Sequence, residues 1–98
     1  MKELKGTPKQ IAFAENIREN LIEGVNEKTM PQLQHIFAIK TEKTQKFITE
    51  LQNLRTTNEY LNNQIVIAKV RQLIENVEDA KFFIDNQSLL SFFKNILK

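Results

Sequence analysis

A capped, helix-periodic stretch near the amino terminus most constrains what this chain can fold into. Thr7, Pro8 and Gln10 form a T-x-x-Q capping box with proline at the first helical position. The apolar residues that follow recur at intervals of three and four: Ile11, Ala14, Ile17, Leu21 and Val25. This pattern predicts a helix from residue 8 to about residue 23, with Gly24 as its end.

Comparable spacing continues through the rest of the chain. Further helices are predicted over residues 31–40, 41–55, 59–78, 78–84 and 88–97, and Thr41 either restarts a helix or lies within a continuous one. A β-rich chain would need many tight turns, whereas this sequence has two glycines and two prolines. We therefore expect an all-α fold. It is a single compact bundle-like domain of four to six helices over residues 7–98, preceded by a flexible leader at 1–6.

The residue inventory argues against most kinds of catalytic and metal site. There is no cysteine and His35 is the single histidine, so neither a thiolate zinc site nor a multi-histidine site can be built. With Gly6 and Gly24 as the only glycines, the chain has no glycine-rich phosphate loop. The acidic residues at 78, 79 and 85 do not match the spacing of a calcium loop. We therefore expect a protein that is not an enzyme and holds no cofactor or metal.

The sequence also lacks the signals of membrane insertion and secretion. No apolar run approaches the ~18 residues that a spanning helix needs, and the charged start of the chain does not resemble a secretory signal. We expect a cytoplasmic protein without a membrane partner.

The sequence contains two pairs of adjacent phenylalanines, Phe82–Phe83 and Phe92–Phe93. The two members of each pair cannot lie on the same face of a helix. One interpretation is that one member of each pair fills the core while the other covers the edge of a neighbouring helix. The alternative is an apolar patch that docks a larger protein. We assign five residues to that docking surface: Phe13, Phe83, Leu90, Phe93 and Leu97.

Basic residues provide candidates for contacts to nucleic-acid phosphates. Lys40, Lys43 and Lys46 recur at intervals of three and are expected to share a helix face. The full set of candidates is Lys9, Arg18, Lys40, Lys43, Lys46, Lys69, Arg71 and Lys81. The alternative is an ordinary solvated surface, because 14 Lys and Arg against 12 Asp and Glu give a net charge of only +2.

Two segments resemble a signature of small proteins from Gram-positive plasmids, phages and chromosomal cassettes. Residues 6–18, GTPKQIAFAENIR, are similar to T-x-K-Q-I-x-W-A-x-x-I-R, and residues 79–86, DAKFFIDN, are similar to A-K-x-W-I-D-N. Phe13 and Phe83 replace the tryptophan that is frequent in that pattern, and Gln87 stands where arginine often follows. We expect the two segments to pack against each other.

Proteins with this signature include the small middle proteins of staphylococcal cassette replication operons, encoded between an A-family polymerase and a helicase. That resemblance implies an accessory subunit that binds the DNA polymerase and supports primer synthesis, touching DNA within the complex. Two other hypotheses remain. One is an inhibitor of a host defence or replication enzyme that acts by steric occlusion, and the other is a self-associating module whose last helix forms a homodimer.

Overall fold

The computed structural model describes residues 2–98 as six α-helices and one short 3-10 helix. They are α1 (Pro8–Glu23), η1 (Glu27–Thr29), α2 (Met30–Phe37), α3 (Glu42–Asn53), α4 (Glu59–Glu75), α5 (Ala80–Asp85) and α6 (Leu89–Ile96). No strand is present between residues 2 and 98. The prediction of an all-α domain with four to six helices is confirmed. None of these helices is long and apolar enough to cross a membrane.

Polar side chains begin nearly every helix. At α1 the Thr7 hydroxyl accepts from the Gln10 amide at 3.2 Å, and the Gln10 side chain accepts from the Thr7 amide at 3.0 Å. Thr29, which precedes α2, makes no side-chain cap to that helix and instead belongs to η1, which Asn26 caps. The other side-chain caps are Thr41, Asn58, Asp79 and Ser88. Local sequence therefore sets the helix starts, because each cap satisfies a backbone donor that would otherwise lack a partner.

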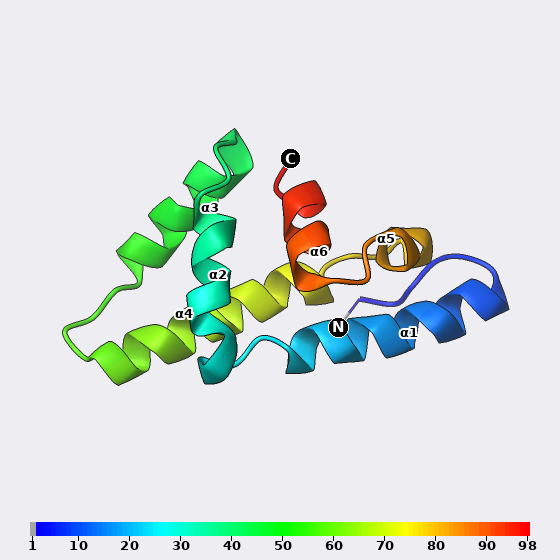
Figure 1. Ribbon diagram of the computed structural model, residues 1–98, viewed down its shortest axis with the longest axis horizontal. Coiled ribbons are helices and arrows are strands. Elements are labelled where there is room, and N and C mark those ends of the chain that lie inside the picture. Colours follow the sequence, from blue (N-terminus) through cyan, green and yellow to red (C-terminus); the bar gives the residue numbers. More distant parts are fainter. Residues whose placement is uncertain (1) are drawn as a thin grey trace.

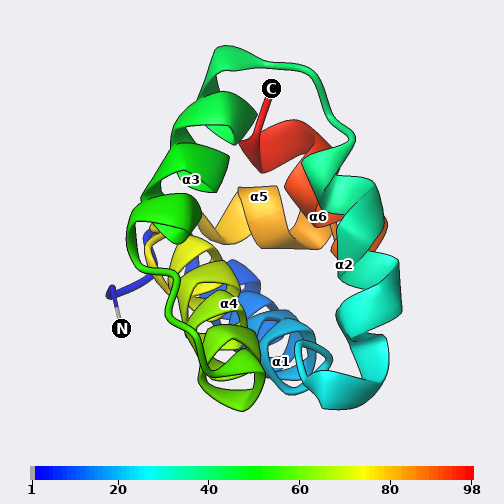
Figure 2. The same cartoon turned by 90° about the vertical axis from the view of Figure 1, so that its left-hand side faces the viewer.

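The helices form an elongated molecule of 45 × 25 × 21 Å (Figure 1). The two longest helices, α1 and α4, both run along the long axis and contact each other near their carboxyl-terminal ends. Helices α2, α3 and α6 all stand on the same side of this pair, and α5 packs against α1 near its amino-terminal end (Figures 1 and 2).

Phenylalanines from α5 and α6 form the centre of the core. Phe83, Phe92 and Phe93 have no exposed surface, whereas Phe82 is half-buried. The Phe92 ring lies 5.6 Å from Phe83, 5.2 Å from Phe93 and 5.3 Å from Phe82, measured between centroids. The expectation of one core member per pair is confirmed for Phe82–Phe83 and wrong for Phe92–Phe93. Because α6 stands between α2 and α3 above α5 (Figure 2), it buries more than one face.

Residues 2–5 belong to the folded domain, so the prediction of a flexible leader is corrected for these residues. The side chain of Leu4 is 5% exposed and joins the core. The backbone of Lys5 pairs with the segment before α5, donating to the Glu78 carbonyl at 2.7 Å and accepting from the Ala80 amide at 3.0 Å. A short apolar residue within a charged segment carries no periodic signal, which is why the sequence pattern missed this contact. Met1 lies outside the described residues.

The segments that carry the family resemblance pack against each other, as expected. Helix α1 begins in one segment, α5 lies in the other, and the two helices are in contact. The two segments approach each other closely at Gly6, where a Cβ atom would lie 3.2 Å from the Cβ of Ala80. Gly6 also has φ of +155°, a conformation that favours glycine. The paired segments therefore form a structural clasp at one end of the molecule.

Candidate binding cleft between α2, α3 and α4

Helix α3 packs on the core through its first half and leaves it in its second half. Thr44 and Phe47 are 0% and 6% exposed, and the Phe47 ring stacks on Phe37 of α2 with centroids 6.2 Å apart. Leu51 is half-buried, and Leu54, just after the helix, is 43% exposed. The apolar stripe of α3 is therefore only partly covered by the domain.

Burial changes in the opposite direction along helix α4, from an exposed first turn to a buried second half. Tyr60 and Leu61 in its first turn are 68% and 45% exposed, whereas Ile67, Val70 and Ile74 further along are buried. The corner between α3 and α4 consequently stands away from the core (Figure 1). The apolar spacing within the predicted helix 59–78 is therefore matched by burial in the second half of α4 only.

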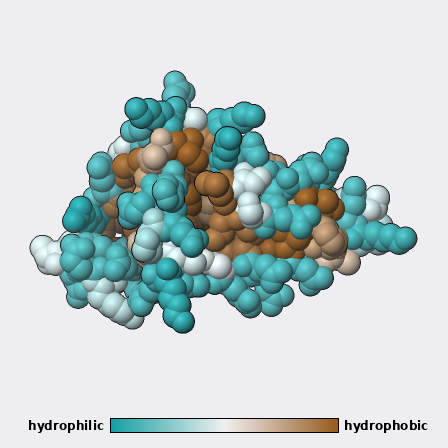
Figure 3. Space-filling view, in the orientation of Figure 1, coloured by the Kyte–Doolittle hydropathy of each residue, from teal (hydrophilic) through white to brown (hydrophobic). Residues whose placement is uncertain are grey.

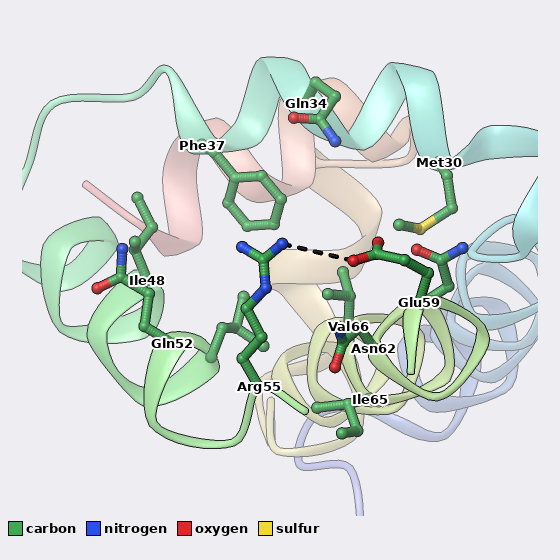
Figure 4. Close-up of a pocket in the computed structure, with 12 residues that line it drawn as sticks. Met30, Gln34, Phe37, Ile48, Gln52, Arg55, Glu59, Asn62, Ile65 and Val66 are labelled. Atoms are coloured by element: carbon green, nitrogen blue, oxygen red, sulfur yellow. Dashed lines mark ion pairs between the residues drawn. The ribbon is translucent and has the colours of Figure 1, made fainter. Parts of the chain in front are cut away.

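The diverging helices leave a cleft of about 340 Å³ that is open to solvent. Its walls come from α2, α3 and α4, and half of the lining residues are apolar (Figure 4): Met30, Phe37, Ile48, Leu51, Ile65 and Val66. Uncharged amides make up most of the polar lining: Gln34, Gln52, Asn62 and Asn63. Such an apolar concavity with a few polar groups around it is typical of a binding site.

The charged residues of the cleft, Arg55 and Glu59, pair with each other. Their Nη2 and Oε1 atoms are 3.5 Å apart, and Figure 4 shows the pair extending across the cleft from the α3–α4 corner. Both side chains are largely exposed, so the pair adds little to stability. Its effect is to leave the cleft without a net charge.

Hydrogen bonds hold the α3–α4 corner in one shape. The Asn62 side chain accepts from the Thr56 amide at 2.8 Å and donates to the Thr56 carbonyl at 3.0 Å. Asn58 caps α4 through the Leu61 amide at 3.1 Å. The cleft is therefore bounded by a defined turn, which supports a preformed site.

The docking surface predicted from the sequence is not a single surface. Phe83, Phe93 and Leu97 are 0%, 0% and 3% exposed, so assigning them to partner contacts was wrong. Each fills the core because α6 is enclosed by its neighbours. Phe13 and Leu90 are exposed, at 48% and 63%, but they lie on α1 and α6 respectively.

Leu90 borders a second hollow, between α2 and α6. Leu33, Ile36 and Leu89 provide its apolar lining, and Gln32 and His35 its polar lining. Apolar surface is visible over α6 between α2 and α1 in Figure 3, with hydrophilic side chains around it. This hollow has a volume of about 340 Å³, equal to that of the cleft, but two helices rather than three provide its walls.

Two of the predicted nucleic-acid contacts have structural partners instead. The Arg71 Nε atom donates to the carbonyls of Ile22 and Val25, at 3.2 and 3.0 Å, and so caps the end of α1 from α4. Arg18 donates through Nη1 to the Lys2 carbonyl at 2.9 Å and holds the amino-terminal segment. Both arginines are half-buried, so their assignment as free phosphate contacts is corrected.

The predicted lysines are scattered over the surface. Lys9 and Lys81 are exposed in the first turns of α1 and α5, and Lys69 is half-buried on α4. Lys40 precedes the cap of α3, so it does not share a helical face with Lys43 and Lys46 as expected. All three side chains are nevertheless exposed and lie within one short segment, residues 40–46.

The clearest electrostatic perturbation lies away from the cleft, at Glu78. Lys5 and Lys2 lie 3.3 and 3.6 Å from its carboxylate and hold its pKa below the ordinary value, with Lys5 the larger cause. Lys2 and Lys5 thus form ion pairs at the clasp. Between residues 2 and 98 no group of three His, Asp or Glu side chains is arranged to hold a metal ion.

No protein-family model matches the chain, and no solved structure matches it. A 69-residue segment, 70% of this chain, is 38% identical to the interferon-induced GTP-binding protein Mx of Ctenopharyngodon idella. The chain spans 11% of the length of that relative. The similarity therefore concerns a small part of a much longer protein and assigns no family.

Proposed function

We propose that this chain is a non-enzymatic accessory protein that binds a larger protein through the cleft between α2, α3 and α4. The partner we propose is the DNA polymerase of the same mobile element, whose primer synthesis the chain supports. The observation that carries the binding proposal is the uncovered apolar face shared by Leu51 of α3 and Ile65 and Val66 of α4.

The chemistry of the cleft favours an amphipathic helix as the occupant. Burying apolar surface contributes roughly 25 cal/mol per Å², so covering these side chains stabilises a complex. Amides at the rim can both donate and accept hydrogen bonds, and the Arg55–Glu59 pair cancels its own charge. A polyanion would find no attraction there. A partner helix with an apolar face and a mixed polar edge would fit.

The choice of polymerase as partner is supported by the resemblance of residues 6–18 and 79–86 to proteins of cassette replication operons. These segments form the clasp between α1 and α5, at the end of the molecule away from the α3–α4 corner (Figure 1). The resemblance therefore supports a shared domain structure. The cleft is a separate feature on which the partner assignment can be tested.

Capture of the polymerase by tagged protein, in nuclease-treated lysate of the host, tests the proposal. A Leu51→Asp substitution places a charge on the cleft wall and should weaken capture at least tenfold, the effect of losing an interface hot spot. Leu90→Asp is the matched control, because Leu90 is more exposed and lies outside the cleft. Circular dichroism checks that both variants keep their helices.

Primer synthesis by the reconstituted polymerase should follow the same pattern. Equal capture by the wild type and Leu51→Asp would refute the cleft as the binding site. Capture of a host defence enzyme in place of a polymerase would refute the proposed partner and favour the inhibitor hypothesis.

A further inference from the structure

Charged side chains are separated in this structure although the net charge of the chain is only +2. Residues 40–46 and 94–98 contain five lysines and one acidic residue, Glu42, a formal charge of +4. The rest of the chain carries −2. We call the surface of these two segments the basic pole. Its lysines are Lys40, Lys43, Lys46, Lys94 and Lys98.

The fold brings the two segments together from opposite parts of the sequence. The Thr41 hydroxyl donates a hydrogen bond to the Leu97 carbonyl, joining the start of α3 to the end of α6. Figure 2 shows the connection between α2 and α3 passing close to the carboxyl-terminal end of the chain. Periodicity within one helix could not reveal this pairing, because Lys40 and Lys94 are far apart in sequence.

The lysines of the basic pole are available to a ligand. All five are exposed, and none forms an ion pair with any of residues 2–98. Lys40 and Lys46 border a shallow hollow that Gln45 also lines. By contrast, the lysines near the clasp include Lys2 and Lys5, which both form ion pairs with Glu78.

An acidic face lies on the other side of the molecule. Glu15, Glu19 and Glu23 recur at intervals of four on α1 and are all exposed. In Figures 1 and 2, α1 is at the bottom and the carboxyl-terminal end of the chain is at the top. This separation of charge repels a polyanion from α1 and directs it toward the basic pole.

We propose that the basic pole binds the phosphate backbone of a nucleic acid. The inference rests on the proposed role in primer synthesis, which brings the chain close to DNA, and it assigns the contact with DNA to a specific surface. Lysine ammonium groups on flexible stems neutralise phosphates without reading bases. The exposed aromatic side chains, Phe13 and Tyr60, lie on α1 and α4, so the pole offers no stacking platform. Binding at this surface is independent of base sequence.

Salt dependence of binding by the isolated chain provides the test. Fluorescence anisotropy of a labelled 20-nucleotide strand and of its duplex is measured between 50 and 200 mM salt. Each phosphate contact contributes about −0.9 to the slope of log K against log salt for duplex and about −0.7 for a single strand. Replacing Lys94 and Lys98 by Gln should make the slope shallower by up to about 1.8 or 1.4 respectively.

The matched control replaces Lys9 and Lys81 by Gln, which removes the same charge at exposed sites of the clasp end. The inference assigns the phosphate contacts to the basic pole and therefore withdraws them from these two lysines, which the sequence had made candidates. This variant should keep the wild-type slope, whereas Lys40→Gln with Lys43→Gln should behave like the Lys94 and Lys98 pair. Equal losses in all three variants would show that overall charge, rather than the pole, governs binding, and would overturn the inference. Absence of salt-dependent binding would also overturn it.

Two further outcomes identify a different ligand and equally overturn the inference. One is displacement of DNA by polyglutamate at the same charge concentration, which would assign the pole to acidic proteins. The other is self-association of the chain at low salt. If it is lost both when the pole lysines are replaced and when Glu19 and Glu23 are replaced by Gln, the pole binds the acidic face of a second copy. Polymerase capture in the presence of nuclease depends on Leu51 and should be unaffected in the pole variants, so failure of this inference is distinguishable from failure of the proposed function.

Discussion

Replacing Arg71 by Met tests whether this arginine stabilises the fold or is held free for phosphate. Its Nε–H group is shared between the carbonyls of Ile22 and Val25, at 3.2 and 3.0 Å, where α1 ends. A hydrogen bond from a charged donor contributes about 1.5–3 kcal/mol. Methionine retains the apolar stem and removes the donor. We therefore expect the free energy of unfolding to fall by roughly 2 kcal/mol.

Chemical denaturation followed by circular dichroism measures this loss directly. In thermal unfolding, 1 kcal/mol corresponds to about 4–8 °C for a domain of this size, so the midpoint should fall by about 8–16 °C. Lys69→Met is the control, because Lys69 is half-buried on the same helix and has no hydrogen bond or ion pair with residues 2–98. It should change stability by no more than about 0.5 kcal/mol.

An unchanged unfolding free energy in Arg71→Met would refute the capping role. The variant should also leave the salt slope of DNA binding at its wild-type value, since the Arg71 side chain is occupied by α1. A shallower slope with normal stability would show that the sequence-based assignment of Arg71 to nucleic acid was right.

Two further predictions concern the clasp. Gly6→Ala should lower the free energy of unfolding by about 1–3 kcal/mol. The reason is that φ of Gly6 is +155° and the new Cβ would lie 2.9 Å from the Gln10 side-chain oxygen. A chemical denaturation curve that shows no loss of stability would contradict this backbone geometry. The lowered pKa of Glu78, caused by Lys5 and Lys2, means that its ionised form is favoured in the folded state. Its stabilisation is present above the ordinary value of 4.5 and is lost as the pH falls through the lowered pKa. In Glu78→Gln the free energy of unfolding should therefore fall less steeply as the pH is lowered into the acid range. Glu19→Gln, on the exposed face of α1, should leave this pH dependence unchanged. Identical stability–pH profiles for the two variants would contradict the role of Glu78.

Local signals in the sequence were sufficient to predict the helices. The T-x-x-Q box at residue 7 and the caps at Thr41, Asn58 and Ser88 act within one turn, so their effect is visible without the fold. The burial of Ala14, which is fully enclosed on α1, follows in the same way from spacing.

Features that depend on how helices are arranged were not predictable from periodicity. Phe92 and Phe93 are both buried because α6 has neighbours on several sides, a property of the whole domain. Leu51 follows the apolar pattern of a core residue, yet it lines an open cleft because α3 diverges from α4. Conversely, Arg71 resembles a surface cation in the sequence but reaches carbonyls on another helix.

The distribution of charge in the basic pole was likewise not predictable from the sequence pattern. Lys40, Lys43 and Lys46 were visible as a group, but Lys94 and Lys98 join them only through the contact between Thr41 and Leu97. A net charge of +2 hides this arrangement, because summing over a chain discards position.

The clasp between α1 and α5 has a consequence for synthesis on the ribosome. Helix α1 ends at Glu23, but helix α5, which packs against it, begins at Ala80, 57 residues later. At 5–20 residues per second, α1 waits about 3–11 s for this partner. During this interval Ile17 and Leu21 are exposed to other nascent chains and to chaperones. Slower translation past residue 24 should therefore increase aggregation, and any product that stops before Ala80 lacks the packing of α5 on its first helix.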